Sequence, residues 1–234
     1  MQQSMLDGEE EDQLVSLFTD TDYQEIKFEY KEIKQTIFAL KTSSTDYDLT
    51  GQIIWKAADI LSKYIIDTLG PEVFAPIKPN ILELGSGPGL CGLISQHYAS
   101  QVVFSDYQDL VMDLIKTNIR DSEPSNKECQ KLAVKLDWCK SSEDSYFDEC
   151  EVYDGSGETK MKLSNTQFQF VIGSDIVYWN NSIKPLMNVL DFKEYNFVVE
   201  EIGQELSKPI EINSFIYKVT RIAQTSTDQE QLQQ

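Results

Sequence analysis

One nine-residue segment constrains the fold of this chain more than any other feature. Residues 81–89 read Ile-Leu-Glu-Leu-Gly-Ser-Gly-Pro-Gly, and Asp106 follows the next apolar run, 102–104. An apolar strand that ends on a glycine-rich turn brings bare backbone N–H groups close to a ligand. A carboxylate roughly twenty residues further on can accept hydrogen bonds from two ribose hydroxyls. The segment therefore predicts a parallel α/β sheet with a nucleoside site at one edge.

The acidic residue within this segment indicates which nucleoside would bind. The carboxylate of Glu83 would repel a pyrophosphate, but it suits a cation such as the sulfonium of S-adenosyl-L-methionine. Residues 87–92 formally match G-x-G-x-x-G, the dinucleotide fingerprint. That fingerprint places its first glycine directly after the strand, where Gly85 stands, and Pro88 removes one N–H from the turn. The residues favour S-adenosyl-L-methionine, and hence a methyltransferase, over a dinucleotide enzyme or a purely structural turn.

Strand and helix patterns alternate along most of the chain. Alternating apolar residues predict a β-hairpin, and helical spacing predicts a helix that ends at Gly70 and Pro71. The expected elements are a hairpin (25–30 and 35–41), helices (51–69, 90–98, 108–119 and 182–190) and strands (80–84, 101–105, 131–136, 168–173, 195–199 and one within 211–222). This order predicts an α/β fold with a mostly parallel sheet and an N-terminal β-hairpin. Together with the glycine turn and its acidic residues, it indicates a doubly wound, Rossmann-like methyltransferase sheet. Because little sequence follows residue 199, we expect the C-terminal part of the sheet to be shortened.

The chain of 234 residues suits one well-buried domain. We expect an acidic disordered tail (1–22), a methyltransferase domain (23–222) and a polar C-terminal tail (223–234). Within the domain, about 139–164 is an acidic insertion.

Composition disfavours several classes of partner. With 20 basic against 39 acidic residues and a net charge of −19, the chain is a poor match for nucleic acid. No apolar run approaches the roughly 18 residues of a membrane span, so no membrane association is expected. The four cysteines lack C-x-x-C spacing, which predicts free thiols and no metal site. The N-terminus lacks the pattern of a secretory signal, so the cytoplasm is the default location, with the nucleus left open.

Two further segments follow core strands and end at the same edge of the expected sheet. Trp138 follows the third core strand, where its indole can form a wall for the adenine. Residues 174–179 follow the fourth and place Asp175 and Tyr178 beside the point of methyl transfer. Each residue also has a structural alternative: Asp106 and Asp175 as helix caps, and Trp138 and Tyr178 as packing residues.

Taken together, these motifs resemble a known family. They are Gly-Gln-Ile-Ile-Trp-Lys-Ala-Ala (51–58), Leu-Glu-Leu-Gly-Ser-Gly-Pro-Gly-Leu (82–90), Ser-Asp-Tyr (105–107), Leu-Asp-Trp (136–138) and Gly-Ser-Asp-Ile-Val-Tyr (173–178). Over residues 25–200 the chain resembles the seven-β-strand protein-lysine methyltransferases of lysine methyltransferase family 16. With Glu83 included, the residues expected at the S-adenosyl-L-methionine site are Trp55, Glu83, Gly85, Ser86, Gly87, Asp106, Trp138 and Ser174. The resemblance implies catalytic roles at the acceptor amine for Asp175 and Tyr178.

The expected reaction is methyl transfer to a lysine amine of a protein substrate, and an acidic rim would attract a basic segment of that substrate. Two alternatives stay open. One is a different acceptor, such as a protein histidine or a small molecule, and the other is a non-catalytic adaptor that only binds the cofactor. The single histidine, His97, is expected to be structural. The sequence leaves the oligomeric state open.

Overall fold

The computed structural model describes residues 23–41, 47–143, 145–148, 150–177, 180–191, 197–201 and 217–221. The two expected tails, 1–22 and 223–234, lie outside these ranges.

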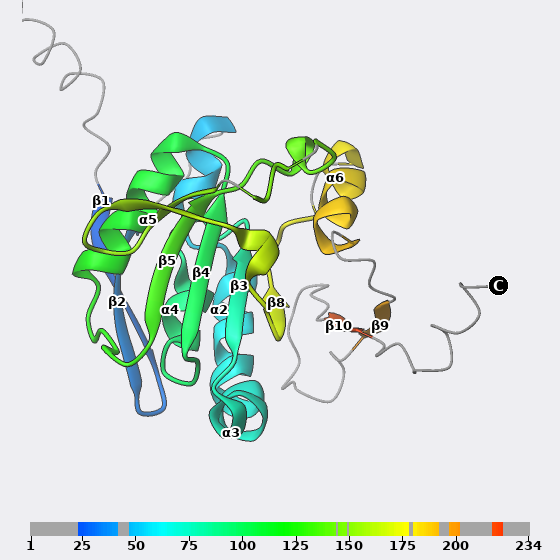
Figure 1. The fold of residues 1–234 in the computed structure, drawn as a ribbon. Helices are drawn as coiled ribbons and strands as arrows, with labels where there is room; N and C mark the ends of the chain where they lie inside the picture. Colours follow the sequence, from blue (N-terminus) through cyan, green and yellow to red (C-terminus); the bar gives the residue numbers. More distant parts are fainter. Residues whose placement is uncertain are drawn as a thin grey trace, which may run out of the picture.

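The centre of the molecule is a six-stranded sheet with the strand order β7-β6-β5-β4-β3-β8 (Figure 1). Its parallel strands are β3 (Asn80–Leu84), β4 (Gln101–Asp106), β5 (Gln130–Lys135) and β8 (Phe170–Ile172). Its antiparallel strands are β6 (Cys150–Tyr153) and β7 (Glu158–Met161). The chain runs outward from β3 to β5 and then returns to the other side of β3 with β8. The point where the strand order reverses therefore lies between β3 and β8, which is where ligands bind in open α/β sheets.

Helices lie on both faces of this sheet, as a doubly wound fold requires. One face carries α2 (Lys56–Tyr64), the π-helix η2 (Ile65–Phe74), α3 (Ala75–Ile77), α4 (Leu90–Ser95) and α5 (Asp109–Asp121). The other face carries α6 (Asn180–Asp191). The 3₁₀ turns are η1 (Tyr47–Gln52), η3 (Trp138–Lys140) and η4 (Leu163–Asn165). The expected fold class, a mostly parallel Rossmann-like α/β sheet, is confirmed.

Two small antiparallel sheets stand apart from the central one. β1 (Tyr23–Tyr30) pairs with β2 (Ile33–Leu40), which confirms the expected N-terminal hairpin. β9 (Phe197–Glu201) pairs with β10 (Tyr217–Arg221) in a separate two-stranded sheet.

Alternation along the strands divides the apolar core between the two faces. In β3, Ile81 belongs to the cluster beneath α4 and α5, whereas Leu82 and Leu84 belong to the cluster beneath α6. Successive side chains of a strand point to opposite faces, so Glu83 faces the same side as Ile81. A carboxyl group therefore occupies a core position directly below α4.

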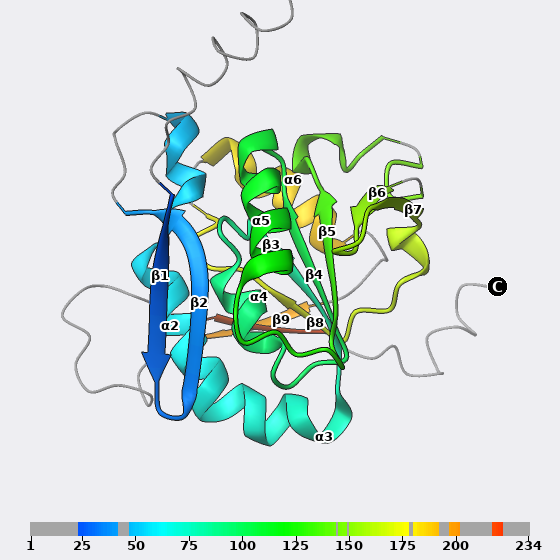
Figure 2. The ribbon, with the colours of Figure 1, turned by 90° about the vertical axis from the view of Figure 1, so that its left-hand side faces the viewer.

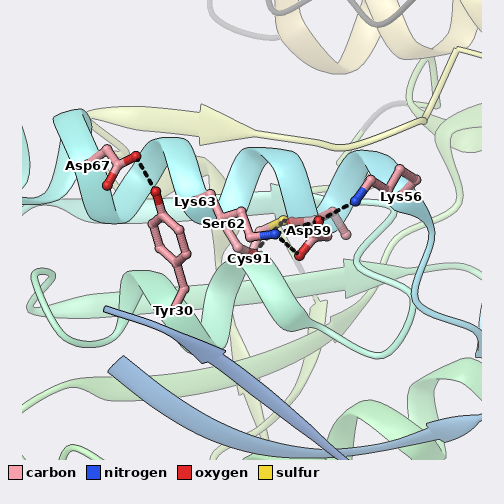
Figure 3. Close-up of polar contacts among 8 residues, drawn as sticks. Tyr30, Lys56, Asp59, Ser62, Lys63, Asp67 and Cys91 are labelled. Carbon is pink, nitrogen blue, oxygen red and sulfur yellow. Dashed lines mark hydrogen bonds and ion pairs between the residues drawn. The ribbon is translucent and has the colours of Figure 1, made fainter. Parts of the chain in front are cut away.

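The hairpin lies against the helical layer and is fastened to it at its turn. Figure 2 shows β2 alongside α5, and Figure 3 shows Tyr30 of the hairpin bonded to Asp67 of η2. The Tyr30 hydroxyl donates to Asp67 Oδ2 at 2.8 Å, and Lys31 Nζ lies 2.5 Å from Asp67 Oδ1. Lys63 Nζ lies 5.6 Å from the centre of the Tyr30 ring and 2.9 Å from Asp59 Oδ1. These contacts fix where the hairpin sits on the helical layer.

The expected end of the first helix at Gly70 and Pro71 is wrong. The helix continues past both residues as η2, whose hydrogen bonds close wider turns than those of an α-helix. Proline disrupts an α-helix because it lacks an N–H and its ring crowds the preceding turn. The wider turn of a π-helix gives the ring more room, although the bond of the missing N–H is still lost. Gly70 has a packing role instead, because a Cβ there would lie 2.5 Å from the Tyr98 ring and 2.7 Å from the Ile65 carbonyl oxygen.

The acidic insertion contains more regular structure than its composition suggests. Its strands β6 and β7 form a hairpin that extends the sheet beyond β5. Phe147, Val152 and Leu163 are buried in the cluster beneath α6. The insertion therefore serves as a cover for one face of the sheet. In the described part of the chain, every helix is too short or too polar to cross a bilayer.

Gly70→Ala is expected to lower the free energy of unfolding by about 1–3 kcal/mol, the usual range for overpacking. The new methyl group would meet the Ile65 carbonyl oxygen, which belongs to the backbone and cannot rotate away. Gly157→Ala is the matched control, because a Cβ at Gly157 meets nothing within 4 Å. Urea unfolding of the two variants checks this prediction, and equal stabilities would contradict it.

Candidate functional site

The candidate site lies where the parallel strands end. The segments that follow β3, β4, β5 and β8 all emerge at the same edge of the sheet. They carry Gly85, Ser86, Gly87, Trp138, Ser174 and Asp175, whereas Trp55 precedes α2, Glu83 lies within β3 and Asp106 is the last residue of β4.

The turn after β3 has a backbone that glycine adopts readily. Gly85, Gly87 and Gly89 have φ values of +56°, +52° and +89°, in the left-handed region that strains other L-residues. A Cβ on Gly85 would lie 2.8 Å from Ile176 Cγ2, and one on Gly87 would lie 3.1 Å from the Gly51 carbonyl oxygen. The glycines therefore allow both a special backbone path and a close approach from two other segments.

Three N–H groups of this turn are not bare, contrary to the expectation from sequence. Ser86 N–H donates to the Ser105 carbonyl at 2.9 Å, and Gly87 N–H donates to Asp106 Oδ2 at 3.2 Å. Gly89 N–H donates to the Ser86 carbonyl at 2.8 Å, and Pro88 has no N–H. A phosphate cradle needs free N–H groups aimed at the ligand. The turn therefore provides shape and close approach, which fits a nucleoside without a pyrophosphate.

Ser86 is buried and fastens the turn to the next strand. Its hydroxyl accepts from Ser105 N–H at 3.0 Å and donates to the Glu83 carbonyl at 3.3 Å. The Ser105 hydroxyl donates to the same Glu83 carbonyl at 2.7 Å. The structure thus shows a bracing role for Ser86, and its predicted contact with the cofactor stays a prediction.

Glu83 is a buried carboxyl, with 2% of its surface exposed. Its Oε2 accepts from Gly92 N–H at 3.2 Å, at the start of α4. Burial raises the pKa of Glu83 to about 8, and the nearby Asp106 charge adds to the increase, while hydrogen bonds from Ser86 and Gly92 oppose it. A positive ligand nearby would favour the ionised form of this carboxyl.

Asp106 lies at the end of β4 and is also largely buried. Its Oδ1 accepts from Tyr107 N–H at 2.7 Å and Gln108 N–H at 3.4 Å, and its Oδ2 accepts from Gly87 N–H. Burial raises the pKa of Asp106, against the effect of these three bonds. A carboxylate has about four lone-pair positions, so one remains on Oδ2 and the long Gln108 bond can be exchanged. The alternative role as a cap for α5 is not realised, because the N-cap residue is Gln108 and its side chain makes no capping bond.

Trp138 and Ile176 meet at Gly85. A Cβ on Gly85 would lie 3.6 Å from the Trp138 ring, on the side where Ile176 also approaches. Trp138 is half-buried and packs against the cluster beneath α6. The structure therefore brings the segments after β3, β5 and β8 together around one glycine.

Trp55 stands just before α2, and its side chain is 43% exposed. Its indole N–H donates to the Thr50 carbonyl at 2.9 Å. Gly51, which follows Thr50 in the chain, lies next to Gly87 of the turn. Trp55 is thus tied to the segment that touches the glycine turn.

Ser174 is joined to the helical layer through Cys91. The Cys91 thiol lies 3.9 Å from Ser174 Oγ and 3.5 Å from the Ala58 carbonyl oxygen, and Ser62 Oγ lies 3.8 Å from the same sulfur. Figure 3 shows Ser62 and Cys91 close together, between α2 and α4. Burial raises the pKa of the Cys91 thiol, so the group is a neutral packing and hydrogen-bonding partner.

Asp175 follows Ser174, is exposed and has a φ of +58°. Aspartate is one of the few residues other than glycine that adopt this backbone at modest cost, and such conformations cluster at functional sites. Tyr178, the second predicted catalytic residue, lies outside the described residues. His97 lies beyond the C-terminal end of α4, whereas the glycine turn precedes the helix. Burial lowers the pKa of His97.

Three residues near the site were missed by the sequence reasoning. Gln52 is fully buried and accepts from the Tyr23 hydroxyl of the hairpin. Asn118 contacts the glycine turn from α5, and Ser105 braces Ser86. Asn118 could have been found, because it continues the apolar stripe of its helix three residues after Ile115.

Comparison with known proteins identifies several relatives. The chain is 28% identical over 135 residues to protein N-lysine methyltransferase METTL21A of Xenopus tropicalis, covering 58% of this chain and 51% of that protein. It is 29% identical over 151 residues to protein-lysine N-methyltransferase EEF2KMT of Homo sapiens, covering 64% and 42% respectively. It is 22% identical over 138 residues to METTL21A of Mus musculus, covering 59% and 53%. The chain thus spans about half the length of the curated relatives it matches.

A family described as lysine methyltransferase matches residues 34–154, just over half of the chain. The match includes β2 from its second residue on, the glycine turn, both buried carboxyls and Trp138. It confirms the resemblance drawn from the motifs. The chain belongs to the lysine methyltransferase family.

Proposed function

We propose that this protein is an S-adenosyl-L-methionine-dependent methyltransferase that acts on a lysine side-chain amine of a protein substrate. The observation that carries the proposal is the pair of buried carboxyls, Glu83 and Asp106, on neighbouring strands beside the glycine turn. Two carboxyls at one edge favour a ligand that brings positive charge and hydroxyl donors. Family membership and the printed names of the relatives support the reaction.

The residues present fit this cofactor. Asp106 would accept from the ribose hydroxyls, and the Trp138 ring beside Gly85 would pack against the adenine. The other residues proposed to contact the cofactor are Trp55, Ser86, Gly87 and Ser174. Glu83, which lies beneath α4, would favour the positive charge of the sulfonium. Gln108 adds a buried Oε1 that has no hydrogen-bond partner within the described ranges, two residues after Asp106. This oxygen is a spare acceptor for a ligand hydroxyl or amine.

When bound, S-adenosyl-L-methionine supplies an electrophilic methyl group. The work left to the protein is to align a neutral amine with that carbon. A lysine with a pKa near 10.4 costs about 4 kcal/mol to deprotonate at pH 7.4, at 1.36 kcal/mol per pH unit. An apolar channel lowers this cost because it disfavours the ammonium form. Asp175, exposed at the β8 edge of the site, would attract and orient the arriving ammonium, and Tyr178 would form a channel wall.

The substrate is proposed to be a protein with a basic segment, because the chain carries a net charge of −19. The cytoplasm is its proposed location. Incubation with labelled S-adenosyl-L-methionine and cell lysate, followed by sequencing of the labelled peptides, tests the reaction. Label on lysine is expected. Label on histidine or a small molecule, or no label despite cofactor binding, would overturn the lysine assignment.

Asp106→Asn should weaken the binding of S-adenosylhomocysteine by at least about tenfold. Each hydrogen bond to a charged group contributes about 1.5–3 kcal/mol, and 1.4 kcal/mol corresponds to a factor of ten in Kd. Asp113→Asn removes a carboxylate from the exposed surface of α5, seven residues further on, and should leave Kd unchanged. Calorimetry measures both values. An unchanged Kd for Asp106→Asn would rule out its ribose role.

Glu83→Gln should change how stability depends on pH. The pKa of Glu83 is about 8 in the folded protein and near 4.3 in the unfolded chain, so the folded state holds the proton more tightly. The resulting stability is fully present below the unfolded pKa and is lost as pH rises toward 8. Relative to Glu83→Gln, the wild-type protein should therefore melt at progressively lower temperature between pH 5 and pH 8. Parallel melting curves across this range would show that Glu83 keeps an ordinary pKa.

Asp175→Asn should reduce kcat much more than it weakens cofactor binding. Asparagine tolerates the same left-handed backbone, so the loop keeps its shape while the charge at the amine is lost. Methylation of a lysine peptide and calorimetry with S-adenosylhomocysteine separate the two effects. Equal losses in both would indicate that Asp175 only supports the loop.

A further inference from the structure

A single buried carboxamide connects the N-terminal hairpin with the glycine turn. Asn118 lies on α5 and exposes 1% of its surface. Its Oδ1 accepts from Phe38 N–H at 2.7 Å. Its Nδ2 donates to the Phe38 carbonyl at 2.9 Å and to the Pro88 carbonyl at 2.9 Å. Both amide hydrogens and the amide oxygen are therefore used, each at good hydrogen-bonding distance.

This arrangement requires an amide in particular. The site presents two carbonyl oxygens and one N–H, so the side chain must offer two donors and one acceptor. Asparagine provides that set at this reach, whereas aspartate would place a carboxylate oxygen against two carbonyls. A buried carbonyl that loses its donor costs about 1–3 kcal/mol. Without the Asn118 side chain, the N–H and carbonyl of Phe38 in β2 and the carbonyl of Pro88 in the turn therefore lose these hydrogen bonds.

The bond to Pro88 fixes one peptide plane of the turn. The carbonyl of the Pro88–Gly89 peptide accepts from Asn118, and its N–H donates to the Ser86 carbonyl. The same turn holds Gly87 N–H against Asp106. The Ser86 carbonyl and the Gly87 N–H belong to one peptide, so a rotation of the Pro88–Gly89 peptide would break the bond that holds this peptide and would loosen the N–H that Asp106 accepts.

We propose that Asn118 is a positioning residue of the cofactor site, through which the hairpin holds the glycine turn in its binding shape. The hairpin then contributes to the site through α5. Figure 2 shows β2 alongside α5, the helix that carries this link. The inference rests on the proposed function, since it assumes that the turn binds S-adenosyl-L-methionine.

The chain offers a matched control in Gln96. This residue is also fully buried, and its Nε2 donates to Gln35 Oε1 of the hairpin at 3.1 Å and to the Pro124 carbonyl at 3.2 Å. It lies at the end of α4 opposite the glycine turn. Its removal should loosen the hairpin without changing the turn.

The first experiment compares Asn118→Ala with Gln96→Ala. Both variants should melt at lower temperature, since each loses a buried carboxamide bonded to the hairpin. At a temperature where both are folded, calorimetry should show that only Asn118→Ala binds S-adenosylhomocysteine more weakly, by at least fivefold. Equal affinity of the two variants would overturn the positioning role. A wild-type protein that fails to bind the ligand would instead refute the proposed function.

The second experiment uses the wild-type protein and decides the question if Asn118→Ala does not fold. Thr36 N–H and Phe38 N–H leave the same edge of β2, but Thr36 donates to the Glu123 carbonyl at 2.7 Å and not to Asn118. Saturating S-adenosylhomocysteine should slow hydrogen exchange at Phe38 at least fivefold more than at Thr36. Equal protection of the two amides would indicate general stabilisation and overturn the proposal.

Discussion

The brace between the end of β3 and the end of β4 is the constraint on which the rest of the site depends. Ser86 and Ser105 exchange two hydrogen bonds across the sheet edge, one of them through a side chain. The Gly87–Asp106 bond continues this brace by one residue. Because β3 lies at the reversal of strand order, the same brace also determines where the segment after β8 can approach. The sheet thus brings the strand ends to one edge, and these few hydrogen bonds fix the glycine turn and Asp106 relative to each other.

Two carboxyls in the same small volume give the site its chemical character. A buried carboxyl is costly because it loses its hydration, and the raised pKa values of Glu83 and Asp106 reflect this cost. Apolar side chains at both positions would avoid this desolvation cost. Under the proposed function, a ligand whose positive charge and hydroxyl donors replace water would recover what burial costs.

The sequence predicted the central sheet well because its strands combine apolar alternation with glycine or proline boundaries. The residues 80–84 expected as a strand match β3. Prediction failed where tertiary contacts override local preference. Tyr98 packs against Gly70 inside a helix that local rules would end, and the acidic insertion forms strands because β5 offers an edge.

Within the site, the type of each strand-end residue was predictable but its partners were not. Asp106 follows an apolar run, which predicts a ligand-facing carboxylate, but its bond to Gly87 depends on the path of the turn. The bonds of Asn118 join residues 30 and 80 positions apart in sequence, which no local pattern encodes. Tyr178 stays a prediction, since it lies outside the described residues.

The internal bonding of the glycine turn has a consequence for how fast and how selectively it can be filled. Because Ser86, Gly87 and Gly89 N–H already have partners, the turn keeps the same shape before a ligand binds. Ligand binding would therefore cost little conformational entropy in the turn. Selection then operates on the rigid outline of the incoming molecule and on its charge. Under the proposed function, analogues that match the nucleoside but lack the positive centre should still dock, and Glu83 beneath α4 would distinguish them from the cation.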